Sequence, residues 1–358
     1  MSLNITKPTL LVDKAICVAN IEKMAKKAAR SNSSLRPHFK THHSAEIGNW
    51  FREFGVDKCT VSSVSMATYF AEHGWDDITI AFPYNPLESD QINELASKIQ
   101  LNILLESTES FELAKKKISC PVGYFIKIDV GTHRTGIDPR NEALIGELAL
   151  SSNETLTFKG FLAHAGHTYG AKDDASIRWI YEGAIKSLNG LKEKFGGIIS
   201  YGDTPSCSLI ESFDGIEELR PGNFIFFDWM QHEIRSCKID QIGVCMACPV
   251  VAIHKERNEV VVLGGAVHLS KDLVVEGSSK CFGKAVSLTQ KGWNTEVIGN
   301  MVRISQEHGI LELTENMIAR VKIGDLIGVI PVHSCLTADL QGHYLSTTGE
   351  RIDKIIKN

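Results

Sequence analysis

The stretch "KCTVSSVSMATYFAEHGWDDITIAF" (residues 58–82) contains a complete strand–helix–strand unit. Its two ends, "KCTVSS" and "DITIAF", are short runs of β-branched and apolar residues that predict strands. Between them, "SMATYFAEHG" has apolar residues at helical spacing and predicts a helix. Units of this kind are typical of parallel sheets, because the helix carries the chain back to the start of the next strand.

The same alternation continues on both sides of this stretch. Further barrel strands are predicted at "LRPHFK", "QLNILL", "GYFIKIDV", "FKGFLAH", "GIISYG" and "ELRPGNFIF". Further helices are predicted at "KAICVANIEKMAKKAAR", "SAEIGNWFREF", "LESDQINELASKI", "NEALIGELALSS" and "DDASIRWIYEGAIKSLNGLKEKF". Strands joined by helices in this way predict an α/β fold, a (β/α)8 TIM-type barrel over residues 14–235. A doubly wound open sheet is the competing fold, but no GxGxxG turn opens a helix.

The pattern changes after residue 235. Segments such as "CMACPVVAIHKERNEVVVLGG", "TEVIGNMVRISQEHGILELT" and "KIGDLIGVIPVHS" are rich in strand residues and turn signals. "PTLLVD" near the N-terminus also predicts a strand. We therefore expect a second, β domain formed by residues 1–13 and 236–358.

Composition excludes several classes of function. The 358 residues are 43% hydrophobic and 23% charged, with a formal net charge of -5. This charge provides no basic surface for nucleic acid or an anionic membrane. No apolar run approaches the roughly 20 residues of a transmembrane helix, and the N-terminus lacks signal-peptide features. We expect a cytoplasmic protein.

The nine cysteines are too few, and odd in number, for a disulfide scaffold. "CMAC" (residues 245–248) has CxxC spacing but lies in an apolar strand-like run, which favours core packing over a metal or redox role.

Chemically active side chains gather after the predicted strands, where a parallel barrel places its active site. In "LRPHFKTHHS" (residues 35–44), Lys40 and His42 follow the first barrel strand. Burial and neighbouring positive charge both favour the neutral amine of a lysine, the form that makes a Schiff base. We expect Lys40 to be catalytic, and His42, on the same face of the strand, to be a cofactor-binding residue. A solvated surface lysine is the alternative.

A phosphate site is predicted at the ends of the last two barrel strands. "GDTPS" (residues 202–206) and "RPGN" (residues 220–223) follow these strands, where barrels bind phosphate through backbone N–H groups. Simple turns are the alternative. A phosphate site together with Lys40 predicts pyridoxal 5'-phosphate as the cofactor. If Arg134, in "DVGTHRTG", faces the pyridine nitrogen, it keeps that nitrogen unprotonated, because a guanidinium retains its own proton. A surface arginine or a salt-bridge partner is the alternative.

A metal site is predicted at "PVHSC". In an extended segment, His333 and Cys335 project to the same side, so both can bind one divalent metal ion. An imidazole and a soft thiolate favour zinc over magnesium or manganese. A turn with a buried cysteine is the alternative.

Together these motifs resemble the metal-dependent D-serine dehydratase and D-threonine aldolase family of fold-type III, alanine racemase-like pyridoxal phosphate enzymes. The resemblance covers nearly the whole chain and rests on an ordered set of motifs: "RPHFKTHH", "DVGTHRTG", "HAGHTY", "GDTPS", "LRPGNFIFFD", "SQEHG", "IGDLIGVIP" and "HSC". It implies a barrel, a C-terminal β domain and a homodimer.

The resemblance also implies roles for individual residues. Lys40 would bind the cofactor aldehyde, Arg134 would face the pyridine nitrogen, and His333 with Cys335 would hold the metal. The remaining cofactor-binding residues would be His164 and Tyr169 beside the ring, and Gly202, Thr204, Gly222 and Asn223 around the phosphate.

The position of Cys335 favours one reaction over another. Family members similar to D-threonine aldolase usually carry aspartate there, whereas dehydratase-like members carry cysteine with zinc. We therefore expect dehydration of a D-3-hydroxy amino acid, a small-molecule substrate, to a 2-oxo acid and ammonia. Lys40 would remove the Cα proton, and the metal would stabilise the departing hydroxide. Retro-aldol cleavage to glycine and an aldehyde is the alternative. A racemase needs no metal, and a non-catalytic pyridoxal phosphate-binding protein would need no second domain.

Overall fold

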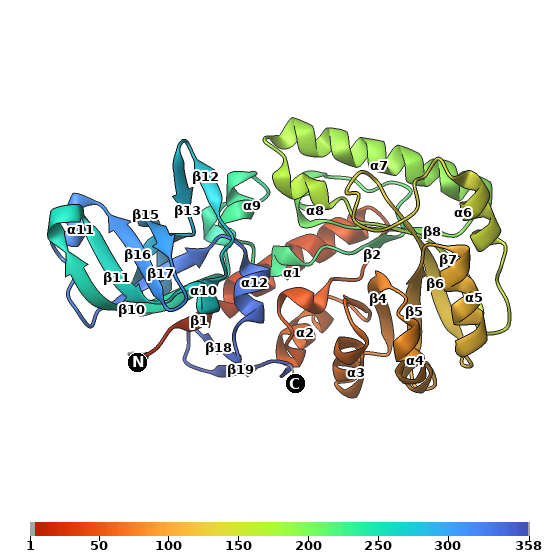
Figure 1. The fold of residues 1–358 in the computed structure, drawn as a ribbon, viewed down its shortest axis with the longest axis horizontal. Coiled ribbons are helices and arrows are strands. Elements are labelled where there is room, and N and C mark those ends of the chain that lie inside the picture. Colours follow the sequence, from red (N-terminus) through yellow and green to blue (C-terminus); the bar gives the residue numbers. More distant parts are fainter. Residues whose placement is uncertain (1–3, 357–358) are drawn as a thin grey trace. The chain divides into compact units, whose positions relative to one another are not determined.

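The computed structural model describes residues 4–356, which fold into two compact units (Figure 1). The barrel unit comprises Glu22–Lys40 and Gly48–Gly222. The β unit comprises Met1–Ile21, Thr41–Ile47 and Asn223–Asn358. The expected domain boundary after residue 235 stays a prediction, and its residues 1–3 and 357–358 lie outside the described residues. No helix within residues 4–356 is both long and apolar enough to cross a membrane.

The barrel unit contains an eight-stranded parallel sheet in the order β2-β9-β8-β7-β6-β5-β4-β3. The strands are β2 (Ser34–Leu35), β3 (Cys59–Val61), β4 (Asp77–Pro83), β5 (Gln100–Leu105), β6 (Val122–Ile128), β7 (Leu156–Ala163), β8 (Ile198–Tyr201) and β9 (Glu218–Leu219). A single parallel bridge between His38 and Thr60 joins the two edges. The predicted barrel of parallel strands is confirmed.

Helices alternate with these strands as the sequence predicts. They are α1 (Lys14–Arg30), α2 (Ala45–Arg52), α3 (Val64–Glu72), α4 (Ser89–Ala96), α5 (Thr108–Lys117), α6 (Glu142–Ala149), α7 (Asp174–Phe195) and α8 (Thr204–Leu209). Figure 1 shows α3, α4 and α5 side by side along strands β4 to β6. Asp13 caps α1, because its carboxylate accepts a hydrogen bond from Ile16 N at 3.1 Å.

Strand β6 shows how the barrel interior is filled. Tyr124 faces the helices, since its hydroxyl donates to Leu148 O of α6 at 2.6 Å. Side chains alternate along a strand, so Phe125 and Lys127 point to the opposite, inner face. There Phe125 packs in a buried cluster with Leu104 and Leu162.

Two predicted strands are shorter than expected. "LRPHFK" is a strand only at Ser34–Leu35, and Phe39–Thr41 forms a 3-10 turn, so Lys40 lies on a turn rather than a strand. "ELRPGNFIF" likewise pairs only at Glu218–Leu219 and continues into a 3-10 turn at Asn223–Ile225. Pro37 and Pro221 lack the N–H that a longer ladder requires.

The β unit contains a nine-stranded, mostly antiparallel sheet in the order β11-β16-β15-β14-β17-β10-β1-β18-β19. The strands are β1 (Thr9–Val12), β10 (Val244–His254), β11 (Glu259–Leu263), β14 (Gly283–Thr289), β15 (Gly292–Ile304), β16 (His308–Leu313), β17 (Leu326–Pro331), β18 (His343–Ser346) and β19 (Arg351–Asp353). Because β10 also pairs with β11, the first six strands in this order close into a ring.

Smaller elements complete the β unit. They are the hairpin β12 (Val274–Glu276) and β13 (Ser279–Cys281), and the short helices α9 (Trp229–Glu233), α10 (Ala266–Leu269), α11 (Glu315–Ile318) and α12 (Ser334–Asp339). Cys245 and Cys248 are fully buried in β10, which confirms the core-packing interpretation of "CMAC".

Candidate active site

Lys40 lies on a turn, and the two residues before it are fixed in the barrel unit. His38 N donates to Pro221 O at 2.9 Å. Phe39 is fully buried, and its ring packs edge-on against Trp75 with centroids 4.8 Å apart. Lys40 itself is exposed, and its backbone N–H lies 3.4 Å from Nδ1 of His38. The turn therefore presents a solvent-accessible amine on a rigid support.

Four of the predicted cofactor-binding residues lie together at the C-terminal ends of β7 and β8. The Nδ1 atom of His164 is 2.6 Å from Gly202 O, and the rings of His164 and Tyr169 are 6.4 Å apart. Tyr169 Oη lies 3.5 Å from the backbone nitrogen of Thr204, the first residue of α8. These contacts bring His164, Tyr169, Gly202 and Thr204 into one cluster.

The electrostatic environment of His164 connects this cluster to Lys40 and Arg134. Burial, followed by the positive charge of Lys40, lowers the pKa of His164 to about 3. Arg134 and Lys127 act in the same direction. His164 is therefore neutral at physiological pH. Its hydrogen bond to a carbonyl places the proton on Nδ1 and leaves Nε2 as an acceptor.

Arg134 is exposed on the loop after β6. The Asp129 carboxylate fixes this loop by accepting hydrogen bonds from the backbone N–H groups of Gly131 and His133, each at 3.0 Å. Thr132 links the loop to the His164 segment, because its hydroxyl donates to His164 O at 3.0 Å.

Two buried cations on the inner face were not predicted as site residues. Lys127 is 6% exposed, and burial together with the charges of Arg220 and Arg134 lowers its pKa to about 7. Arg220 is 4% exposed and donates from Nε to Ser200 Oγ at 2.7 Å. Alternation along "GYFIKI" places Lys127 on the same face as Phe125, which is the signal that could have identified it.

The barrel unit has features that fit a phosphate-bearing cofactor. The hydroxyl of Thr204 is fully buried and has no hydrogen-bond partner among the described residues. Gly202 runs so close to Arg220 that a Cβ atom would lie 2.6 Å from the Arg220 carbonyl carbon. Gly222 follows Pro221, whose carbonyl oxygen accepts a hydrogen bond from the backbone N–H of His38. A buried hydroxyl that lacks a partner suits an acceptor group such as a phosphate oxygen of pyridoxal phosphate.

His42 and Asn223, the other two predicted cofactor-binding residues, belong to the β unit. His42 is fully buried, its Nδ1 accepts from Ser44 N at 3.1 Å, and burial lowers its pKa well below the ordinary value. The amide nitrogen of Asn223 donates to Asp228 Oδ2 at 2.6 Å and lies 3.5 Å from Cys335 Sγ. The Asn223 side chain thus contacts the predicted metal pair, and its role at the phosphate stays a prediction.

His333 and Cys335 lie at the start of α12, not in the extended segment that the sequence predicts. His333 is the N-cap residue, with extended backbone, and Cys335 is the second residue of the helix. Burial would lower the pKa of His333, but hydrogen bonds to Asp272 and Cys335 outweigh it and raise the pKa to about 11. The two side chains are therefore within hydrogen-bonding distance of each other, as ligands of a common metal would be.

The donor set of this pair fits a zinc-like ion. An imidazole and a thiolate are ligands that zinc prefers, and catalytic zinc keeps positions open for water or substrate. Among residues 4–356, no group of three or more His, Cys, Asp and Glu side chains is placed to hold a metal.

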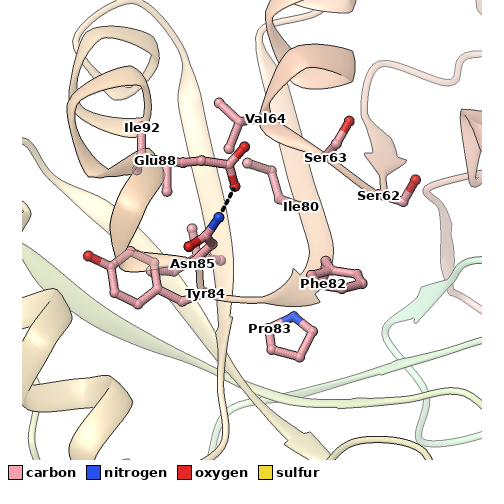
Figure 2. Close-up of a pocket in the computed structure, with 11 residues that line it drawn as sticks. Ser62, Ser63, Val64, Ile80, Phe82, Pro83, Tyr84, Asn85, Glu88 and Ile92 are labelled. Atoms are coloured by element: carbon pink, nitrogen blue, oxygen red, sulfur yellow. Dashed lines mark hydrogen bonds between the residues drawn. The ribbon is translucent and has the colours of Figure 1, made fainter. Parts of the chain in front are cut away.

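A pocket of about 160 Å³ lies elsewhere in the barrel unit (Figure 2). Its walls include Val64 of α3, Ile80 and Phe82 of β4, and Ile92 of α4. None of the predicted site residues lines this pocket, and Asn85 closes one side by donating to Glu88 at 3.0 Å. The predicted catalytic, cofactor-binding and metal-binding residues therefore lie outside this pocket.

Comparison with known proteins identifies the two parts of the chain. Residues 12–228 match the family model "Alanine racemase, N-terminal domain", and residues 244–347 match "Putative serine dehydratase domain". The chain is 30% identical to a D-serine dehydratase of Dictyostelium discoideum, covering 95% of this chain and 93% of that protein. It is 25% identical to a 3-hydroxy-D-aspartate aldolase of Paracoccus denitrificans, covering 98% and 91%.

A solved structure shows the same fold. It is a cysteine-to-alanine variant of a D-threo-3-hydroxyaspartate dehydratase in the metal-free form, with a TM-score of 0.90, 20% identity, and coverage of 99% of this chain and 98% of that one. The chain therefore belongs to the family of pyridoxal phosphate-dependent lyases in which an alanine racemase-type N-terminal domain is joined to a serine dehydratase domain.

Proposed function

We propose that the protein dehydrates D-3-hydroxy amino acids, D-serine above all, to a 2-oxo acid and ammonia, using pyridoxal phosphate and one zinc ion. The observation that carries this proposal is the position of Thr41. Its hydroxyl lies 3.4 Å from Cys335 Sγ, and Thr41 is bonded directly to Lys40. The chain thus joins the predicted cofactor lysine to a residue that touches the predicted metal pair.

The cofactor assignment is supported by the cluster around His164. Lys40 offers the accessible amine, Thr204 offers an unsatisfied hydroxyl for phosphate, and Arg134 offers a lasting positive charge. Pyridoxal phosphate, when bound, supplies an aldehyde that condenses with amines and a ring that accepts the electrons released at Cα. Neutral His164 presents an acceptor nitrogen beside it, with its other nitrogen fixed on Gly202 O.

The residues of the chain have separate tasks in this reaction. The Lys40 amine takes the proton from Cα, and His333 with Cys335 holds the metal. Zinc supplies Lewis acidity, which favours loss of a β-hydroxyl as hydroxide. The relative named D-serine dehydratase supports elimination as the outcome, and so does cysteine, rather than aspartate, at position 335.

Retro-aldol cleavage is the second candidate, because a relative of similar coverage is named an aldolase. The two reactions differ in products from the same substrates. D-Serine, D-threonine and D-3-hydroxyaspartate are incubated with the loaded enzyme, and 2-oxo acid plus ammonia is measured against glycine plus aldehyde. We expect 2-oxo acid and ammonia. Glycine and aldehyde as the sole products would establish the aldolase reaction, and an epimerised substrate with neither set of products would establish a racemase.

One variant and one metal-removal experiment test the assigned residues. Borohydride should fix the cofactor to the wild-type chain but not to Lys40→Ala, and a mass increase in Lys40→Ala would refute the role of Lys40. A chelator should abolish turnover of D-serine and zinc should restore it, whereas full activity without metal would refute the Lewis-acid role.

The resemblance to the family also leads us to propose a homodimer in the cytoplasm. The nine cysteines are too few and odd in number for a disulfide scaffold, as expected in a reducing compartment. Light scattering of the purified protein and fractionation of cells test the two points.

A further inference from the structure

We propose that Asp272 is a positioning residue for the metal site: its carboxylate orients the His333 ring so that Nε2 faces the metal. This inference rests on the proposed function, because it assigns a support to the predicted zinc pair. Asp272 lies in the segment between α10 and β12, and Oδ2 is 2.8 Å from His333 Nδ1. It belongs to none of the motifs from which the metal site is predicted.

The contact selects one form of the imidazole. To bind a metal the imidazole must be neutral, with its proton on one ring nitrogen and a lone pair on the other. The Asp272 carboxylate only accepts hydrogen bonds, so it favours the proton on Nδ1 and leaves Nε2 as the ligand. Histidines that bind metals commonly donate their other N–H to a carboxylate, which fixes the ring and increases its basicity.

The backbone around Asp272 is held independently of its carboxylate. Thr337 Oγ1, on α12, donates to Leu269 O at 3.0 Å. Gln341 Nε2, just after α12, donates to His268 O at 2.8 Å. The helix that carries the metal pair thus fastens the end of α10, only a few residues before Asp272. Replacing the carboxylate should leave this segment in place.

Cys335 has a different set of supports. Asn223 Nδ2 lies 3.5 Å from its sulfur, and Asp228 holds that amide at 2.6 Å. Asp228 also accepts from Ser334 N at 2.9 Å, so it fixes the first residue of α12. Because Cys335 has its own contacts with Asn223 and Thr41, the loss of Asp272 acts first on the imidazole and reaches the sulfur only through the His333–Cys335 contact. The prediction for Asp272 therefore concerns the His333 ligand.

The test measures zinc affinity, not turnover. Wild-type protein, Asp272→Ala and Asp272→Asn, each loaded with pyridoxal phosphate and stripped of metal, compete for zinc with a chromophoric chelator. Loss of such a supporting carboxylate typically weakens metal affinity roughly 10- to 100-fold, and we expect this for Asp272→Ala. Asp272→Asn should lie between it and wild type, because the amide oxygen still accepts from Nδ1–H but carries no charge.

Glu307→Gln is the matched control. Glu307 is also a carboxylate beside a histidine of the β unit, with Oε2 4.0 Å from His268 Nε2, but that histidine is not a predicted ligand. Its zinc affinity should equal that of wild type. The melting temperature of each metal-free variant establishes that the fold is intact.

The proposal is overturned if Asp272→Ala binds zinc within twofold of wild type, or if Glu307→Gln weakens binding as much. Should Asp272→Ala fail to fold, the near-isosteric Asp272→Asn decides by the same comparison. Failure of the proposed function has a different signature, namely wild-type protein that binds zinc tightly but yields no 2-oxo acid from D-serine.

Discussion

Replacing Arg36 by methionine should strongly destabilise the closure of the barrel unit. Arg36 Nε donates to Glu218 Oε2 of β9 at 2.6 Å, and its terminal nitrogens donate to the two carboxylate oxygens of Asp77, at the start of β4, at 2.8 and 3.0 Å. The side chains of Arg36 and Glu218 are 5% and 4% exposed. The guanidinium therefore links strands on both sides of the closure, shielded from water.

The magnitude follows from what the substitution leaves behind. Methionine keeps the length of the apolar stem, but Glu218 retains only Ser200, at 2.5 Å, as a side-chain donor in this network. Breaking a buried ion pair by removing one partner costs about 3–5 kcal/mol. Such a cost corresponds to about two to four powers of ten in the equilibrium for opening this part of the sheet.

Hydrogen exchange at two backbone amides measures this opening. His38 N donates to Pro221 O and Thr60 N donates to Pro37 O, each at 2.9 Å, so both amides report on the closure. In Arg36→Met, the protection of both amides against exchange should fall by about two to four powers of ten. The control is Lys98→Met, since the Lys98–Glu94 pair is 2.8 Å long but its side chains are 63% and 71% exposed. An exposed pair of this kind contributes little to stability.

The reasoning is refuted if Arg36→Met loses no more protection than Lys98→Met. The double variant Arg36→Met/Glu218→Gln provides a second check. It should be more stable than the sum of the single effects implies, because no unpaired Glu218 charge then remains in the interior.

Two further predictions concern the candidate cofactor site. Gly202→Ala should weaken binding of pyridoxal phosphate, because the added Cβ would lie 2.6 to 2.8 Å from backbone atoms of Arg220. Absorbance titration measures this binding. The control is Gly170→Ala, whose Cβ would have nothing within 4 Å and which should bind the cofactor like wild type. In the cofactor-free protein, the free energy of unfolding should fall as the pH decreases from about 6.5 towards 3, because unfolded His164 gains a proton that the folded form, with its pKa of about 3, excludes. Urea midpoints should show a weaker dependence over this range in His164→Gln, and equal slopes for both proteins would contradict the assignment.

Much of the fold follows from local sequence, because barrel strands and their helices carry distinct periodicities. "QLNILL" predicts β5 over its full length, and "KAICVANIEKMAKKAAR" predicts α1 over its full length. The lysine-rich helix α5 was missed, since its few apolar residues make a weak helical pattern. No helix is predicted at α8, because the Asp203 cap and Pro205 that begin it are also typical of turns.

The candidate site was predictable in its residue types but not in its geometry. Motif order identified Lys40, His333 and Cys335, yet Lys40 lies on a 3-10 turn and the metal pair lies at a helix start. Support by Asp272 depends on a contact across 61 residues, which no local pattern encodes. Burial of a charge such as that of Lys127 likewise depends on the neighbours that tertiary structure provides.

The pairing of the first barrel strand, β2, with the last one, β9, has a consequence for how the protein is made. Residues 34–35 pair with residues 218–219, so the first strand lacks this neighbour until the last one leaves the ribosome. At typical rates of synthesis this interval is roughly 10–40 s. During it, a growing parallel sheet displays unpaired N–H and C=O groups to other nascent chains. Codon choice and chaperone supply across residues 60–217 should therefore govern the soluble yield more than the stability of the finished barrel does.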